Sequence, residues 1–327
     1  MPALTEPFSI GPVRLDNRVL LAPLAGIGTW FVRLQARRHG AGLAVSEMVS
    51  SFAIHHRNEK TMRELLRIHP AEGAVSIQLF GQDPEVMRSA AKTVAQRGAS
   101  IIDLNMGCPV PKVCKTGAGA ALISDPDTAV AVARAARVGS GLPVTVKLRS
   151  GRRPGETDGF DLAHRLVNEA GVSAIGFHPR SAAVHHKGTP DYALAARLVQ
   201  TLDAPVILTG GLRDRDAVLA AHAQTGAAAV MLARGSLGNP WLFEQVLGRR
   251  DDEPTRDEVL SELDWLIDRA VEHMGPERGG RWLRKAYPWY LDRLHAPRAT
   301  QAALQQAGSL EQVRELLRGL RAGALAA

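Results

Sequence analysis

Residues 103–122 read DLNMGCPVPKVCKTGAGAAL, and this stretch connects an apolar strand to the next helix through a loop that carries a thiol. The strand contains Ile101, Ile102 and Leu104, and it breaks at Gly107, just before Cys108. Strand-to-helix connections in α/β proteins usually take about two to six residues, so this much longer connection predicts a lid or a binding loop. Taken alone, Cys108 could equally be a small buried hydrophobe or an active thiol.

The same order of strand, turn and helix recurs on both sides of this stretch. Asp83-Pro84 and Asp125-Pro126 are typical helix starts. Repeated strand–helix units of this number predict a (β/α)₈ TIM barrel rather than an open doubly wound sheet, and no G-x-G-x-x-G motif follows the first strand. The predicted strands are Val19–Pro23, Leu43–Glu47, Val75–Phe80, Ile101–Asn105, Val144–Leu148, Ala174–His178, Val206–Thr209 and Ala229–Leu232.

The pattern changes near residue 250, where helix periodicity continues without strands. We therefore expect a barrel domain over residues 1–248, followed by a small all-helical domain over residues 249–327. Residues 251–277 carry ten acidic and two basic side chains, whereas residues 278–321 carry nine basic and three acidic ones. The basic part is interleaved with Trp and Tyr, a mixture that suits phosphate backbones and exposed bases. We expect these aromatic residues to form the core of the domain and several of its arginines to contact RNA.

The composition limits the class of protein. The chain has 327 residues, of which 45% are hydrophobic, and no apolar run is long enough for a membrane helix. The first residues show no signal-peptide pattern, and the two cysteines, Cys108 and Cys114, are not placed like a disulfide framework. We therefore expect a cytoplasmic protein with no membrane association and no metal site. The formal net charge of +7 allows a polyanionic partner but does not require one.

Catalytic groups in a TIM barrel lie at the carboxyl ends of the strands, because the βα loops converge there. After the first strand, Pro23, Leu24 and Ala25 would present main-chain groups to a flat heterocycle, and Gln78 could bind a pyrimidine-like edge. The loops after the last two strands predict a phosphate site. Its candidate residues are Gly210, Gly211, Ala233, Arg234 and Gly235.

Two further side chains at these strand ends suggest a redox cofactor. Lys147 ends an apolar strand, and a buried ammonium needs an anionic partner, so it could stabilise a reduced flavin near N1 and O2. A Schiff-base role, as in aldolase-type barrels, remains an alternative. His178 could donate to a cofactor or its phosphate, or only cap a turn.

The motifs LAPLAG, SEM, QLFG, DLNMGCPVPKVCKTGAGAALI, VTVKLR, FHPR and VMLARGSLGNPWLF occur in the order found in tRNA-dihydrouridine synthases. The chain resembles the bacterial DusB-type branch over nearly its whole length. The resemblance implies an FMN-bound barrel that reduces the C5=C6 bond of selected uridines in tRNA, with NADPH reducing the flavin. It also implies hydride transfer from reduced FMN to C6 and proton transfer from Cys108 to C5. A general acid must hold its proton, and an anionic reduced flavin nearby should keep this thiol neutral.

The resemblance also assigns roles to individual residues of this sequence. It implies that Asn105 holds the target base and that Arg180 lies near the RNA or the base, and we add Lys115 as a third substrate-binding candidate. The residues that it assigns to the flavin and its phosphate are Gln78, Lys147, His178, Gly211, Arg234 and Gly235. The chain departs from the family at Leu24, where Met is common, and at residues 209–211, where Asn-Gly-Asp is common.

Two other functions stay open at this point. One is a small-molecule flavoenzyme of the dihydroorotate dehydrogenase or old-yellow-enzyme type, which would not need the basic helical tail. The other is a tRNA-binding chaperone without catalysis, which would not need Cys108. For the leading function, tRNA reduction, we expect the chain to act as a monomer.

Overall fold

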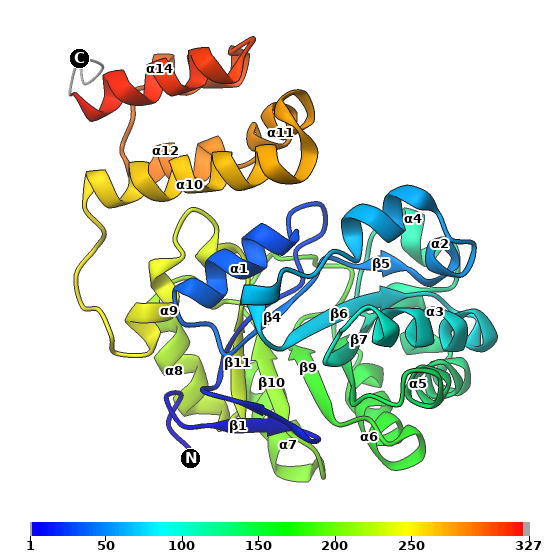
Figure 1. Ribbon diagram of the computed structural model, residues 1–327. Coiled ribbons are helices and arrows are strands. Elements are labelled where there is room, and N and C mark those ends of the chain that lie inside the picture. The colour runs from blue at the N-terminus through cyan, green and yellow to red at the C-terminus, as the bar shows by residue number, and fades with distance from the viewer. Residues whose placement is uncertain (1, 323–327) are drawn as a thin grey trace. The chain divides into compact units, whose positions relative to one another are not determined.

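Eight parallel strands form the centre of the structure, a computed structural model that describes residues 2–322 (Figure 1). They are β3 (Val19–Leu21), β4 (Leu43–Val45), β6 (Val75–Phe80), β7 (Ile101–Met106), β8 (Val144–Arg149), β9 (Ala174–His178), β10 (Val206–Thr209) and β11 (Ala229–Leu232). Each strand pairs with the next one in this series, and β11 pairs back with β3, so the ring is closed. This confirms the TIM barrel that the sequence predicts. No helix within residues 2–322 is both long and apolar enough to cross a lipid bilayer.

Helices surround this ring (Figure 1). The long ones are α1 (Trp30–Arg38), α3 (Pro84–Gln96), α5 (Pro126–Ser140), α6 (Asp158–Ala170), α7 (Tyr192–Thr201) and α8 (Arg215–Thr225). Four of them begin after an aspartate whose carboxylate accepts N–H groups of the first helical turn, which stabilises the helix start. These aspartates are Asp83, Asp125, Asp191 and Asp214, and the first two are the helix starts predicted from the sequence.

Short elements occupy two of the long connections between the strands. Between β4 and β6 lie β5 (Val49–Ser50), α2 (Ser51–His55), the π-helical η1 (Thr61–Leu65) and the 3₁₀ turn η2 (Pro70–Glu72). The long connection after β7 contains α4 (Pro111–Cys114) and the 3₁₀ segment η3 (Gly119–Ser124). The thiol loop is therefore built from two short helical segments.

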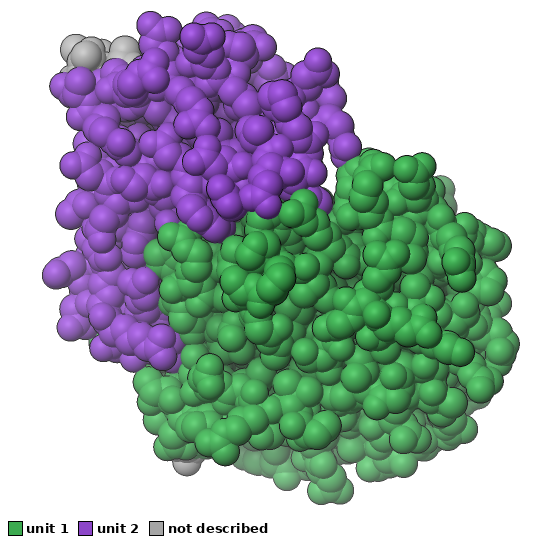
Figure 2. All heavy atoms as spheres, viewed as in Figure 1, with its two compact units in different colours: residues 1–233 green, residues 234–327 purple. Residues whose placement is uncertain are grey.

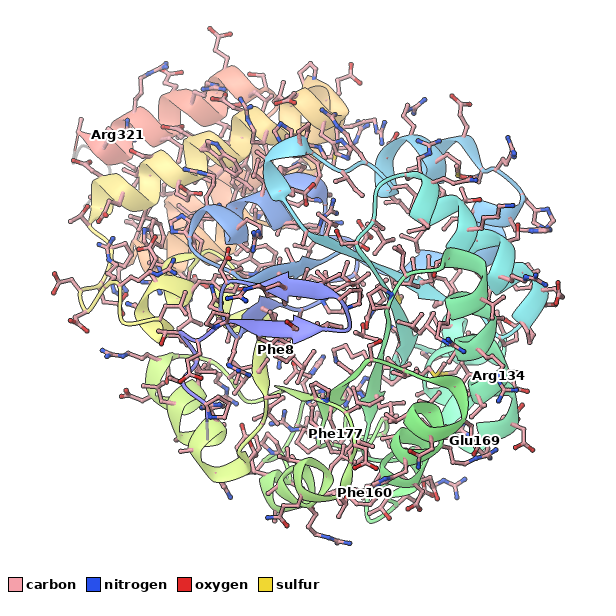
Figure 3. All side chains as sticks on the ribbon, turned by 60° about the horizontal axis from the view of Figure 1, so that its bottom comes forward. Phe8, Arg134, Phe160, Glu169, Phe177 and Arg321 are labelled. Carbon is pink, nitrogen blue, oxygen red and sulfur yellow. The ribbon has the colours of Figure 1, made fainter. Side chains whose placement is uncertain are left out.

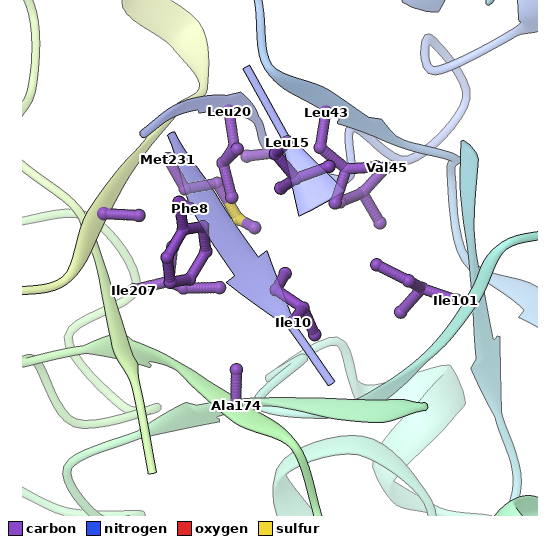
Figure 4. Packing of buried hydrophobic residues seen from close by; sticks show 12 residues of the cluster. Phe8, Ile10, Leu15, Leu20, Leu43, Val45, Ile101, Ala174, Ile207 and Met231 are labelled. Carbon is purple, nitrogen blue, oxygen red and sulfur yellow. The ribbon is translucent and has the colours of Figure 1, made fainter. Parts of the chain in front are cut away.

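A hairpin of β1 (Phe8–Ile10) and β2 (Val13–Leu15) packs against the amino-terminal end of the barrel. Phe8, Ile10 and Leu15 join the apolar cluster that includes Ile101 and Ala174, the first residues of β7 and β9 (Figure 4). Figure 3 views the molecule from this side, with Phe8 on the hairpin across the barrel. The hairpin closes this end with side chains, so a ligand of the barrel must bind from the opposite end, where the βα loops lie.

The chain divides into two compact units, residues 1–233 and 234–327 (Figure 2). The second unit contains η4 (Arg234–Ser236), α9 (Trp241–Val246), α10 (Arg256–Met274), α11 (Pro276–Leu283), α12 (Tyr287–Arg293), α13 (Arg298–Gln306) and α14 (Leu310–Arg321). The sequence-based boundary, after residue 248, lies beyond η4 and α9, which group here with the helical unit.

In the helical unit, aromatic residues are buried and part of the charge is paired within the unit. Trp282, Tyr287 and Tyr290 are buried, so they form core, as the sequence suggested. Several arginines of the basic segment bind carboxylates of the acidic one, a pairing between segments that the charge pattern of the sequence does not show. The pairs are Arg293 with Glu253, Arg314 with Asp268, and Arg321 with Asp264. Arg281, Arg284 and Lys285 are exposed.

Candidate active site

The thiol candidate, Cys108, follows the end of β7 and is held by hydrogen bonds on both of its main-chain groups. Its N–H donates to Oδ1 of Asn105 over 2.9 Å. Its carbonyl oxygen accepts the N–H of Ala120 at 3.0 Å and the thiol of Cys114 at 3.2 Å. Cys108 is half-buried, and burial raises the pKa of its thiol. The thiol therefore keeps its proton at neutral pH, as a general acid must.

Asn105 is itself oriented by a row of polar side chains inside the barrel. Its Nδ2 donates to Oε1 of Gln78 over 2.9 Å, and Nε2 of Gln78 donates to Oδ2 of Asp103 over 2.6 Å. The hydroxyl of Thr145 donates to the other oxygen of Asp103. Gln78 is buried and both ends of its amide bind protein groups. Burial raises the pKa of Asp103 to about 6.

Positive charge collects beside the thiol. Burial, followed by the charge of Arg149, lowers the pKa of Lys147 to about 8, while Asp103 raises it. Burial lowers the pKa of Arg149 to about 10. Burial and then the charges of Lys147, Arg149 and Arg180 lower the pKa of His178, so its imidazole is neutral. Nε2 of His178 lies 3.2 Å from Nη1 of Arg180 and accepts its N–H. Such a group of cations in a buried setting favours an anionic ligand.

Arg149 connects two loops, the one after β7 and the one after β9. Its guanidinium donates to the carbonyl oxygens of Gly107 at 3.0 Å, Ser181 at 3.1 Å and His185 at 2.7 Å. Arg149 and Asp103 have no role among the sequence-based candidates. The sequence did carry a signal for both, because Asp103 lies within a predicted barrel strand, where charged residues are rare, and Arg149 directly follows another predicted strand, at its carboxyl end.

Gly210 and Gly211 follow β10 and require glycine. Their φ angles are +99° and +83°, a region that other residues rarely adopt. A Cβ on Gly210 would lie 2.4 Å from Cδ2 of His178, and one on Gly211 would lie 2.4 Å from the hydroxyl of Tyr192. That hydroxyl donates to the carbonyl of Gly210 over 2.9 Å. The backbone here consequently stays uncovered by side chains of its own, as close approach to a phosphate requires.

The turn after β3 is fixed from two sides. Oε2 of Glu47 accepts the N–H of Gly26 at 2.9 Å, and the carbonyl of Gly28 accepts a bond from Arg33 at 3.2 Å. Within this turn Ala25 is exposed, Pro23 is partly exposed and Leu24 is buried. Ala25 and Pro23 can thus meet a ligand.

The remaining candidates are Lys115, Ala233, Arg234 and Gly235. Lys115 is exposed at the end of α4, and Ala233 follows β11. Arg234 and Gly235 form part of η4 in the helical unit, where Arg234 is exposed. Gly238, which follows them, packs on the backbone of Trp289, since its Cβ would lie 2.7 Å from the carbonyl carbon of Trp289.

A closed parallel barrel with a protonated thiol, a cationic cluster and a glycine pair at the carboxyl ends of its strands has the features of a TIM-barrel enzyme. Solved structures share this fold. Morphinone reductase in complex with tetrahydroNAD matches with a TM-score of 0.55 and 17% identity over 79% of this chain and 94% of that one. The old yellow enzyme homologue from Zymomonas mobilis matches with a TM-score of 0.55 and 16% identity over 79% and 96%.

Comparison of the sequence with known proteins identifies the family. The family model described as dihydrouridine synthase (Dus) matches residues 20–322. The probable tRNA-dihydrouridine synthase 1 of Synechocystis sp. is 34% identical over 318 residues, 95% of this chain and 88% of that protein. The tRNA-dihydrouridine synthase B of Pseudomonas aeruginosa is 35% identical over 301 residues, 90% and 89% of the two chains. The chain belongs to the dihydrouridine synthase family, which confirms the resemblance seen in its motifs.

Proposed function

We propose that this protein reduces selected uridines of tRNA to 5,6-dihydrouridine, with FMN bound in the barrel and NADPH as the reductant. The family membership supports the reaction. The observation that carries the proposal is the half-buried thiol of Cys108, whose backbone is held by Asn105 at the barrel rim beside a buried cationic cluster.

The residues at the rim fit an anionic flavin. Lys147 would face its negative charge, and the neutral ring of His178 would bind polar atoms of the cofactor. The uncovered backbone of Gly210 and Gly211 would take the phosphate, together with Ala233, Arg234 and Gly235 as the sequence suggests. Pro23, Leu24 and Ala25 would flank the ring system, and Gln78 would complete this set. When bound, reduced FMN would supply the hydride for C6 of the uracil.

The protein groups would supply the proton and hold the base. Cys108 would give its proton to C5, since burial keeps the thiol neutral until that step. Asn105 would bind the base through its amide, whose orientation is fixed by Gln78. Arg180 and Lys115 would contact the RNA. A uridine inside a folded tRNA must leave its stack to reach this rim.

We assign FMN binding to residues 1–248 and tRNA binding to residues 249–327, and we propose that the enzyme works as a monomer in the cytoplasm. Arg281, Arg284 and Lys285 are exposed in the helical unit and suit phosphate contacts.

The test is direct. The purified full chain, loaded with FMN and supplied with NADPH, should form dihydrouridine in tRNA from a strain that lacks this modification. Unchanged tRNA would refute the proposal. Turnover of a free pyrimidine or an enone, with no reduction of tRNA, would instead indicate a small-molecule flavoenzyme. An effect on tRNA folding that survives Cys108→Ala would indicate a chaperone.

A further inference from the structure

We propose that Asp103 is a positioning residue: its carboxylate fixes the amide orientation of Gln78, through it that of Asn105, and thereby the backbone of Cys108. The inference rests on the proposed function only in linking this order to uridine reduction. The contacts themselves belong to the protein alone.

The row begins on three neighbouring strands. Gln78 on β6, Asp103 on β7 and Thr145 on β8 are paired in register, so their side chains share one layer of the barrel. Asp103 is 3% exposed and Gln78 is 1% exposed, so bulk water has little access to replace a lost partner. Each buried donor here therefore needs an acceptor from the protein, and each buried acceptor needs a donor.

The carboxylate sets the direction of every bond that follows. An ionised Asp103 can only accept, so Gln78 must turn its Nε2 towards it and its Oε1 away. That oxygen can only accept, so Asn105 must present its Nδ2 to Gln78 and its Oδ1 to the loop. Oδ1 of Asn105 then accepts the N–H of Cys108 at 2.9 Å and that of Gly107 at 3.3 Å.

Without the acceptor oxygen of Asp103, the amide orientations of Gln78 and Asn105 are no longer fixed. An amide has a donor end and an acceptor end of nearly equal shape, so Gln78 could turn over once Asp103 no longer accepts from it. Asn105 would then meet a donor and could turn over as well, placing its Nδ2 against the N–H of Cys108. A general acid works only when its proton lies within reach of the reacting atom, so loss of this order would slow proton transfer.

Two substitutions of Asp103 distinguish its role as a hydrogen-bond acceptor for Gln78 from the effect of its negative charge. Asp103→Leu removes the acceptor. Asp103→Asn keeps it, because the asparagine oxygen can accept from Gln78 while its amide donates to the hydroxyl of Thr145. Thr145→Val is the matched control, since it removes the other bond to Asp103 and leaves the one that orients Gln78.

The first measurement is amide hydrogen exchange of the FMN-loaded full chain without tRNA. Asp103→Leu should accelerate exchange of the Cys108 N–H by roughly five- to tenfold, the worth of one hydrogen bond, with the amides of β10 unchanged. Asp103→Asn and Thr145→Val should both match the wild type at Cys108. Gln78→Met breaks the row one step later and should reproduce the Leu result, which keeps the test available if Asp103→Leu does not fold.

The second measurement follows flavin reduction and uridine reduction separately. In Asp103→Leu, single-turnover reduction of uridine should slow by a larger factor than reduction of the flavin by NADPH, and Asp103→Asn should restore the uridine step. Uniformly faster exchange across the barrel, or Asn as defective as Leu, would overturn the inference. A wild-type enzyme that leaves tRNA unchanged would refute the proposed function and leave the exchange result standing.

Discussion

Replacing Glu72 by glutamine should destabilise the barrel unit by about 3–5 kcal/mol, the usual cost of removing one partner from a buried ion pair. Arg33 in α1 and Glu72 in η2 are both buried, with side chains 1% and 0% exposed. Nε of Arg33 lies 2.7 Å from Oε2 of Glu72, and Nη2 lies 3.1 Å from Oε1. Oε1 also accepts the N–H of His69 at 2.7 Å. A glutamine that keeps the contacts of Oε1 must point its NH₂ at the Nε–H of Arg33, so it loses one bond and all of the compensating charge.

Thermal unfolding followed by circular dichroism measures this cost. In a unit of this size 1 kcal/mol corresponds to about 2–4 °C, so the midpoint should fall by roughly 6–20 °C. Glu169→Gln is the matched control, because Glu169 pairs with Arg165 on the surface, where the two side chains are 41% and 36% exposed. Surface pairs of this kind contribute little, and the control should leave the midpoint unchanged within error.

A midpoint for Glu72→Gln equal to that of the control would refute this reasoning. The double substitution Arg33→Met with Glu72→Met provides a second check. It removes both charges, so it should recover part of the loss, while the carbonyls of Gly28 and Arg67 and the N–H of His69 still lose their side-chain partners. If the double variant is as unstable as the single one, the unpaired charge of Arg33 is not the cause of the lost stability.

Three further outcomes follow from the site and the helical unit. Cys108→Ala should slow uridine reduction by about 10²–10⁴; filter binding should find tRNA affinity unchanged, and a large loss of binding would contradict this role. Neutralising Arg281 and Arg284 with glutamine should weaken tRNA binding and lower the salt slope by about 1.5; Arg314→Gln, whose arginine already binds Asp268, should not change that slope. Burial raises the pKa of Asp103 from 3.8 to about 6, so its ionisation above that pH costs stability. Urea unfolding of the flavin-free protein should therefore find Asp103→Asn more stable than wild type by up to about 3 kcal/mol at pH 8 and by less than about 1 kcal/mol at pH 4. The same gain at both pH values would exclude this cause.

The strands of the barrel could be predicted because each one is a short apolar run between glycine, proline or polar residues. Val75–Phe80 and Val206–Thr209 agree to the residue with the structure. The hairpin at residues 8–15 could not be predicted in this way, since its strands have three residues each, too few for their alternation to stand out from the surrounding sequence. Its position depends on the apolar end of a barrel that must form first.

The candidate site divides similarly. The motif around Cys108 and the strand-end positions of Lys147 and His178 are visible in the sequence. The row from Thr145 to Asn105 is not, because it depends on the register of three strands and on burial of a carboxylate. The same holds for charge in the tail, where residues distant in sequence, such as Arg314 and Asp268, neutralise each other only after folding.

The hairpin also has a consequence for synthesis of the chain. Phe8 and Ile10 leave the ribosome before the barrel strands, yet the cluster that buries them includes Ala229 and Met231 of the last barrel strand. The same delay applies to Arg18, whose guanidinium donates to the carbonyl of Ala228 over 2.8 Å. Contacts over such sequence separations form late, so the nascent chain must carry this apolar hairpin uncovered until almost the whole barrel has been made. We expect truncated chains that end before β11 to aggregate, and deletion of residues 8–15 to relieve part of that tendency.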